Sequence, residues 1–349
     1  MSGSRQVRWW HGPLSLLLTL VLCAATVEVA PRAYWRLEYQ LSFRRPNHPL
    51  YAFYPELKSA DEVRPRHDDP YYDVLMLGAS TLHHSWGEVE AALAERLEAA
   101  GLHNVRIFNL AVPAHTSRDS LLKYAALNDP RFDLVIVYDG ANDVRTNNVP
   151  PQMFREDYSH YSWYSYVNVL APSHGTATFA LPYTFRYARA RLRQRLAPDQ
   201  FVPLNEPRPE WLEYGREARS AKVFEHNIAA ILDLATQRGD PVMLMTFATW
   251  VPENYSRDAF AAKRLDYGLH RTPIELLGRR EDVVRTIAMH NDVLRHLAAG
   301  RANTIFVDQA LLMEGSARNF DDAFHFTIAG SIAFVDHLMA VLRPHLPKH

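Results

Sequence analysis

The chain has 349 residues, of which 48% are hydrophobic and 22% charged, so it can bury a full core and is neither disordered nor fibrous. Lys and Arg number 38 against 39 for Asp and Glu, a formal net charge of -1, so no general attraction to nucleic acid is expected. Its one cysteine, Cys23, excludes an intrachain disulfide and a cysteine-built metal site.

An uncharged apolar stretch lies near the N-terminus. Trp9 to Val27 follows Arg5 and Arg8, contains no Asp, Glu, Lys or Arg, and has its most apolar part at Leu14 to Leu22. About 20 apolar residues cross a bilayer, so residues 1–30 predict a membrane anchor or signal segment. We favour an anchor that holds the folded part of the chain outside the cytoplasm, in the periplasm or beyond the cell.

Three alternatives remain for this stretch. A cleaved signal peptide is the main one, because cleavage after Ala25 would leave Cys23 and Ala25 at the small-residue positions. A lipoprotein fits less well, since Leu22 stands where a small residue should precede the modified cysteine. A buried helix of a soluble protein is the third. The arginines that follow the stretch leave its orientation open.

The rest of the chain divides into a connector and an α/β domain. Residues 31–70 mix aromatics, prolines and charges without a clear period, whereas residues 71–349 alternate between two kinds of segment. Apolar runs of strand length occur at 73–78, 105–110, 133–138, 241–247 and 304–308. Helical spacing occurs at 89–97, 117–127, 221–237 and 283–299, and a last helix begins near residue 327. This alternation predicts a parallel sheet with helices on both faces, which binds its ligand at the carboxyl ends of the strands.

The alternation fails between about residues 149 and 220. This segment is rich in Tyr and Trp, carries a basic amphipathic stretch from Arg186 to Arg195, and is too long for a crossover loop. We expect an insertion that caps the site. Its aromatics fit sugar stacking or an interfacial belt, but they fit a small packed subdomain equally well. A second irregular stretch, Trp250 to Arg280, is expected to line the rim.

A serine directly follows the first predicted strand. Gly78 and Ala79 precede Ser80 and are small enough to let a substrate approach its hydroxyl, as a nucleophile requires. Serines after strands are also common turn and capping residues, so this position alone does not decide between the two roles.

The candidate base is His325, which precedes the last helix. Asp322 stands three residues earlier, close enough to orient the imidazole, and Asp321 is an alternative partner. With 17 histidines in the chain, only the position of His325 after the last strand distinguishes it. The adjacent pair His83 and His84 lacks the spacing of metal ligands and is expected at the surface or behind the site.

Two further positions can supply donors to an oxyanion. Asn142 follows the third strand and can offer its side-chain amide, while Ala114 follows the second strand and can offer its backbone N–H. Asn142 can instead cap a helix or close a turn. His115, the next residue after Ala114, is expected to line the pocket.

This ordered set resembles the SGNH hydrolase, or GDSL esterase/lipase, superfamily over residues 73–143 and 219–343. The closest matches to its motifs are Gly140-Ala141-Asn142-Asp143 and the DxxH block Asp322 to His325. The resemblance implies a three-layer sandwich with a mostly parallel, flavodoxin-like sheet. It also implies Ser80 as nucleophile, His325 as base, Asp322 as its partner, an oxyanion hole from Ser80, Ala114 and Asn142, and no cofactor.

Two positions depart from the family pattern. Ala79 replaces the Asp of the first block, which removes a supporting hydrogen bond. Ala114 replaces a Gly, so its methyl group would clash if the position requires a positive φ, and we expect weakened activity or a restriction to small acyl groups.

The resemblance thus implies a serine esterase that hydrolyses an oxygen ester of a small molecule, carbohydrate or lipid through an acyl-enzyme. The N-terminal stretch adds the expectation of a membrane anchor. Two alternatives stay open: an acyltransferase acting on envelope polysaccharide, and a non-catalytic carbohydrate- or envelope-binding module. No HExxH, P-loop or GxGxxG pattern supports metal, nucleotide or dinucleotide chemistry.

Overall fold

A five-stranded parallel sheet forms the centre of the computed structural model, which describes residues 11–203 and 206–347. Its strands are β1 (Tyr72–Gly78), β2 (Val105–Asn109), β3 (Leu134–Tyr138), β4 (Val242–Met245) and β5 (Thr304–Val307). They lie in the order β2-β1-β3-β4-β5, and every neighbouring pair is parallel. This is the flavodoxin-like order, so the predicted fold class is confirmed.

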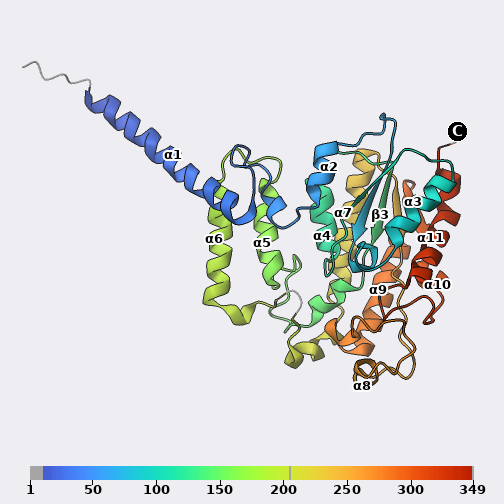
Figure 1. Cartoon of the computed structure of the whole chain (residues 1–349). Helices are drawn as coiled ribbons and strands as arrows, with labels where there is room; N and C mark the ends of the chain where they lie inside the picture. Colours follow the sequence, from blue (N-terminus) through green and yellow to red (C-terminus); the bar gives the residue numbers. More distant parts are fainter. Residues whose placement is uncertain (1–10, 204–205, 348–349) are drawn as a thin grey trace, which may run out of the picture.

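Helices cover both faces of the sheet (Figure 1). On one face α4 (Ser117–Ala126) packs against α7 (Ser220–Arg238), which also contacts α9 (Arg280–Ala298). On the other, α3 (Val89–Ala99) packs against α11 (Ile328–Leu342). Each predicted strand and helix of this domain is present, with bounds that differ by a few residues at most.

Two apolar cores result from the alternation of side chains along the strands. Leu75 and Leu77 of β1 face the core under α4 and α7, whereas Val74 and Met76 face the core under α3 and α11. A strand buried on both faces has no polar side, which is why these strands are continuous apolar runs in the sequence. At the end of β1, a Cβ on Gly78 would stand 2.7 Å from the carbonyl oxygen of Tyr138, so only glycine fits there.

The N-terminal helix is longer than the sequence indicated. α1 runs from His11 to Tyr39, so residues 31–39, which we expected in the connector, continue the helix. Among the described residues, one helix is long and apolar enough to cross a membrane, Ser15–Tyr39 with a mean hydropathy of 1.7. Its Leu and Val side chains at 16–18, 20–22, 27 and 29 are exposed, while Trp35 is buried in the core.

The connector also belongs to the core rather than bridging two separate parts. It contains α2 (Leu57–Val63), and its Leu50, Tyr54 and Leu57 are buried under the same face of the sheet as α4 and α7. Apolar residues separated by irregular turns gave no period in the sequence, although each one packs.

The aromatic insertion forms a small packed unit beside the sheet. It contains α5 (Ser162–Leu170) and α6 (Leu181–Leu196), which lie side by side and meet the end of α1 (Figure 1). Tyr158, Tyr161 and Tyr164 are buried there, so these rings are not exposed for sugar stacking.

Shorter elements complete the described chain. They are α8 (Arg257–Ala261), α10 (Gln309–Leu312) and the 3-10 turns Pro49–Ala52, Ser80–Leu82, Asn142–Asn147, Ala171–Ser173, Pro198–Gln200, Pro209–Arg216, Ile274–Leu276 and Arg343–His345.

Candidate active site

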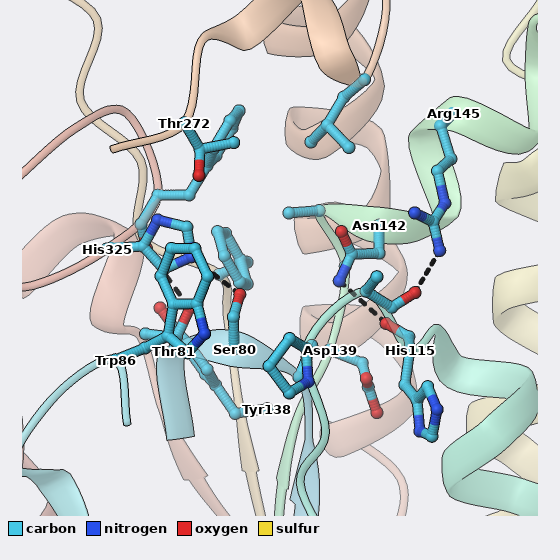
Figure 2. Close-up of a pocket in the computed structure, with 18 of the residues that line it drawn as sticks. Ser80, Thr81, Trp86, His115, Tyr138, Asp139, Asn142, Arg145, Thr272 and His325 are labelled. Carbon is cyan, nitrogen blue, oxygen red and sulfur yellow. Dashed lines mark hydrogen bonds between the residues drawn. The ribbon is translucent and has the colours of Figure 1, made fainter. Parts of the chain in front are cut away.

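Ser80, His325 and Asp322 form one continuous hydrogen-bonded chain, although 245 positions separate the serine from the histidine. Figure 2 shows the Ser80 and His325 part of this chain. The Ser80 Oγ lies 2.7 Å from His325 Nε2. On the other side of the ring, Nδ1 lies 2.9 and 2.8 Å from the two carboxylate oxygens of Asp322. β1 ends just before the serine, and α11 begins just after the histidine, so both groups lie at the carboxyl edge of the sheet.

The carboxylate of Asp322 is fully buried and held by backbone N–H groups. Its Oδ1 accepts from the N–H of Phe324 and of His325, at 2.9 and 3.0 Å, and its Oδ2 accepts from the N–H of Thr272 at 2.9 Å. These bonds fix the orientation of the carboxylate. The carboxylate therefore orients the imidazole with Nδ1–H toward itself and Nε2 free to accept the serine proton.

Asp321, the alternative partner, points elsewhere. Its carboxylate lies 3.4 Å from the guanidinium of Arg271 rather than on the imidazole. The three-residue spacing of Asp322 and His325 is thus the one that the chain uses to place a carboxylate against the ring.

An indole ring covers the imidazole. Trp86 stacks on His325 with the ring centroids 4.4 Å apart, and Arg271 lies over the indole while donating to the Trp86 carbonyl at 3.0 Å. Stacking fixes the imidazole plane, excludes water from one face and places π-electron density beside a ring that gains charge during proton transfer. No sequence pattern pointed to Trp86, because it lies far from the DxxH block along the chain.

The loop after β2 supplies the opposite wall of the site. Ala114 has φ 68°, in the left-handed region that disfavours any residue with a Cβ, so this position does adopt the positive φ that a glycine would tolerate better. Two neighbours hold it there: the guanidinium of Arg145 donates to the Ala114 carbonyl, and the Asn142 amide donates to the His115 carbonyl at 2.9 Å. Both come from the 3-10 turn after β3 (Figure 2).

This arrangement leaves donors directed at one region. Within the described part of the chain, the backbone N–H groups of Ser80 and Ala114 have no acceptor, and the Asn142 amide has a second proton besides the one on His115. All three residues line the same cavity as the Ser80 hydroxyl. Such donors can stabilise an oxyanion without reorganisation.

Replacing Ala114 with glycine is expected to stabilise the protein by about 1 kcal/mol, because the left-handed conformation costs a residue with a Cβ roughly this amount. Chemical unfolding of the full chain in detergent measures the difference. Ala111, which is buried in the same loop without a positive φ, is the matched control, and Ala111→Gly should destabilise the protein instead. An Ala114→Gly protein less stable than the wild type would contradict this account of the loop.

The cavity holds about 200 Å³ and is lined mainly by apolar groups. Thr272, Leu276 and Leu277 contribute one side, so the stretch 250–280 lines the rim as expected. His115 also lines the cavity. None of the described residues of the insertion, 149–203 and 206–220, does so, and the expected cap is therefore wrong.

The insertion instead supports the site from behind. Tyr158 donates to Asp143 at 2.9 Å, Tyr164 donates to Asp119 at 2.5 Å, and Tyr161 donates to the Arg145 carbonyl at 2.9 Å. Asp143 is the last residue of the Gly-Ala-Asn-Asp motif, and its Oδ2 also accepts from the N–H of Ser117, which begins α4. The aromatic rings thereby fix the two loops that carry the oxyanion donors.

Asp139 is a buried acid that the sequence analysis did not single out. It lines the cavity, and its Oδ2 has no hydrogen-bond partner among the described residues. Burial and, to a smaller degree, the neighbouring carboxylate of Asp143 raise the pKa of Asp139 to about 7. Its position one residue before Gly140 was the only available signal.

The raised pKa of Asp139 predicts a pH-dependent stability. The folded protein holds the Asp139 proton up to about pH 7, whereas the unfolded chain releases it near pH 4. The contribution of this proton to the free energy of unfolding is therefore present at low pH and is lost as the pH rises between these values. Asp139→Asn should flatten this decline, which can reach about 1.4 kcal/mol per pH unit. The free energies of unfolding of the wild type and of Asp139→Asn, measured from pH 4.5 to 8, show this difference. Parallel curves for the two proteins would contradict the assignment of the decline to Asp139.

One cluster outside this site brings possible metal ligands together. Atoms of His48, Asp61 and His174 lie within 4.8 Å of one another, and burial lowers the pKa of His174 to about 3. However, the N–H of Leu50 donates to His174 Nδ1, which leaves the proton of the neutral ring on Nε2, facing His48 Nδ1 at 3.5 Å. The two rings are thus arranged to bond to each other rather than to an ion.

No family model and no curated protein sequence matches the chain. Solved structures do. A GDSL-like lipase from Bacteroides thetaiotaomicron is 13% identical with a TM-score of 0.44, and the match covers 84% of this chain and 98% of that one. A lipase/acylhydrolase from Enterococcus faecalis is 12% identical with a TM-score of 0.41, covering 79% and 98%. An acetyl xylan esterase from Geobacillus stearothermophilus is 16% identical with a TM-score of 0.40, covering 80% and 97%.

Identities this low, with TM-scores below 0.5, carry no argument about the activity of this chain. The strand order and the placement of the motifs agree with the expectation drawn from the sequence. The chain has a parallel α/β fold with the flavodoxin-like strand order.

Proposed function

We propose that the protein is a serine esterase that hydrolyses an oxygen ester through an acyl-enzyme on Ser80. The observation that carries this proposal is the hydrogen-bonded chain from the Ser80 hydroxyl through His325 to the buried Asp322. A binding module would have no need for a buried carboxylate on an imidazole that in turn contacts an accessible hydroxyl.

The first half of the reaction forms the acyl-enzyme. His325 Nε2 takes the proton as the Ser80 Oγ attacks the ester carbonyl carbon, and the negative charge that develops on the carbonyl oxygen is met by the Ser80 and Ala114 N–H groups and the Asn142 amide. When the C–O bond breaks, the imidazolium gives its proton to the leaving alcohol.

The second half releases the acid. Water attacks the acyl carbon while His325 accepts its proton, and collapse of the intermediate returns that proton to Ser80. Asp322 keeps the imidazole in place throughout and stabilises its charged form. No group outside the chain is needed for these steps.

The substrate is proposed to carry a small acyl group, on a carbohydrate, lipid or other small alcohol. The cavity of about 200 Å³ has room for a short acyl chain, and the Ala114 methyl group occupies space beside the oxyanion donors that a glycine would leave open. Rates on p-nitrophenyl esters of increasing chain length should therefore fall beyond the shortest members.

Covalent labelling tests the nucleophile directly. The full chain in detergent should react with a fluorophosphonate probe, and mass spectrometry should locate the adduct on Ser80. Ser80→Ala should abolish labelling, whereas Ser85→Ala, which changes an exposed serine on the same loop, should not. An adduct on any other residue, or none at all on a folded wild-type protein, would overturn the proposal.

We also propose that α1 anchors the protein in a membrane with the catalytic domain outside the cytoplasm. The exposed Leu and Val side chains at 16–18, 20–22, 27 and 29 support this, because in water they would form a large apolar surface. Protease protection of the full chain in spheroplasts tests the orientation, and a catalytic domain shielded in intact spheroplasts would contradict it.

A further inference from the structure

α6 carries an unbalanced positive charge. This helix, Leu181–Leu196, contains five arginines and no acidic residue. One of them, Arg191, faces the N-terminal helix, where it donates to the Tyr34 hydroxyl at 3.0 Å. Three others, Arg186, Arg189 and Arg193, recur at helical spacing and belong to a separate surface of α6.

That surface is hollowed. A cavity of about 350 Å³ lies between α5 and α6 and is lined by Arg186, Arg189, Arg193, Phe185 and Phe201, together with polar groups of α5 that include Ser165 and Asn168. It shares no residue with the cavity at Ser80. A concave site with convergent donors and aromatic edges is the usual form of a small-ligand site.

The three guanidinium groups are differently engaged. Arg186 is held in place by the carbonyl of Val169 at 3.2 Å and by the Ser173 hydroxyl. Arg193 lies over the Phe201 ring, 5.9 Å from its centroid. Arg189 has no hydrogen-bond, ion-pair or ring partner within residues 11–203 and 206–347. Arg186 is therefore fixed, and the guanidinium groups of Arg189 and Arg193 remain available to bind an anion in the hollow.

The charge balance sets the kind of anion. Among the described residues that line the hollow, the only carboxylate is that of Asp157, which accepts from the Ser159 N–H at 3.0 Å. Three guanidiniums against one carboxylate leave an excess of two positive charges. Arginine forks bind phosphate oxygens in a bidentate manner, so a phosphate group matches both the charge and the donor geometry.

The hollow also lies near the level at which α1 leaves the domain. Glu28 of α1 accepts from the N–H groups of Ala180 and Leu181, and further along the two helices Trp35 donates to Thr184 at 2.7 Å, so they run side by side in the same direction. Arg186 is five residues beyond Leu181, or about 8 Å along α6 at 1.5 Å per residue. With the apolar part of α1 in a bilayer, Arg186 would lie about one headgroup layer beyond the hydrocarbon, and Arg189 and Arg193 would lie farther out, about 12 and 18 Å along α6 from Leu181.

We propose that the hollow between α5 and α6 binds a phosphate group, supplied by a membrane phospholipid headgroup or by a soluble phosphate. The site is independent of the esterase chemistry, because it shares no residue with the catalytic cavity. It would hold an anionic partner against the insertion while Ser80 remains free to react.

Calorimetry on the full chain in dodecyl maltoside micelles tests this site with two probes, dihexanoyl phosphatidylglycerol and inorganic phosphate. Arg189→Gln combined with Arg193→Gln removes two exposed guanidiniums and one ring contact, that of Arg193 with Phe201, and should weaken binding at least about tenfold. The matched control is Arg264→Gln with Arg318→Gln, which makes the same change in charge at exposed positions outside the hollow. This control should bind like the wild type.

The two probes separate the sources. Binding of both, with the same dependence on the arginines, shows that the phosphate group alone is recognised, and binding of the phospholipid alone identifies a membrane lipid as the ligand. Absence of saturable binding of either probe, or equal affinity in the double variant and the wild type, would overturn the proposal. Since no turnover is measured, failure here is distinct from failure of the esterase assignment.

Discussion

Ser80→Ala is expected to lower kcat/KM for p-nitrophenyl acetate by about 10⁴-fold or more, because the hydroxyl that His325 activates is lost while the rest of the site remains. Steady-state kinetics on the full chain in detergent measure the change. Ser85→Ala serves as the control, since it removes a hydroxyl from an exposed position on the same loop and should leave the rate within about twofold.

The opposite result would be decisive. Equal hydrolysis rates in the Ser80→Ala protein and the wild type, with equal unfolding midpoints, would show that the observed turnover does not use this serine. The fold would then serve a binding role, and the hydrogen bond between Ser80 and His325 would have to be explained without catalysis.

Asp322→Asn is expected to cost about 10⁴-fold in kcat with little change in KM. The amide can no longer stabilise the imidazolium, and its NH₂ group favours the tautomer with the proton on Nε2, which cannot accept from Ser80. The pH dependence of kcat adds a readout that simple unfolding would not give, because the remaining activity should depend differently on pH from that of the wild type.

The neighbouring carboxylate provides an internal control. Asp321→Asn alters a group that pairs with Arg271 and does not touch the imidazole, so it should change kcat by less than about tenfold. A larger loss in Asp321→Asn than in Asp322→Asn would show that the carboxylates exchange roles during turnover.

The sheet could be predicted because each of its strands has a pattern within a short run of the sequence. Strands buried on both faces must be apolar throughout, and their ends must be followed by small or polar residues, so β1 and β3 are visible as runs that end at Gly78 and just before Asp139. Ser80, Asn142 and His325 could then be assigned to one edge, because parallel strands place all their carboxyl ends together. The structure brings all three to one cavity.

The parts that escaped prediction depend on contacts between distant segments. Composition showed that the insertion is aromatic, but not that Tyr158 and Tyr164 point toward buried carboxylates rather than toward the cavity. Likewise, the mixed residues 31–70 gave no period, although Tyr54 donates to Asp119 at 2.7 Å and is fully buried. Side-chain direction within irregular segments is set by tertiary packing, which a single sequence does not record.

The unbroken passage of α1 into the domain limits how the protein can move. Glu28 and Trp35 both bond to α6, so no flexible linker separates the apolar part of the helix from the folded part. With α1 embedded, the catalytic pocket would keep a constant height and tilt above the lipid surface. Without a flexible linker, the domain could not move away from the membrane. The protein would then reach substrates only by lateral diffusion within a thin layer next to the membrane surface. Esters outside that layer would have to diffuse or be carried to the pocket.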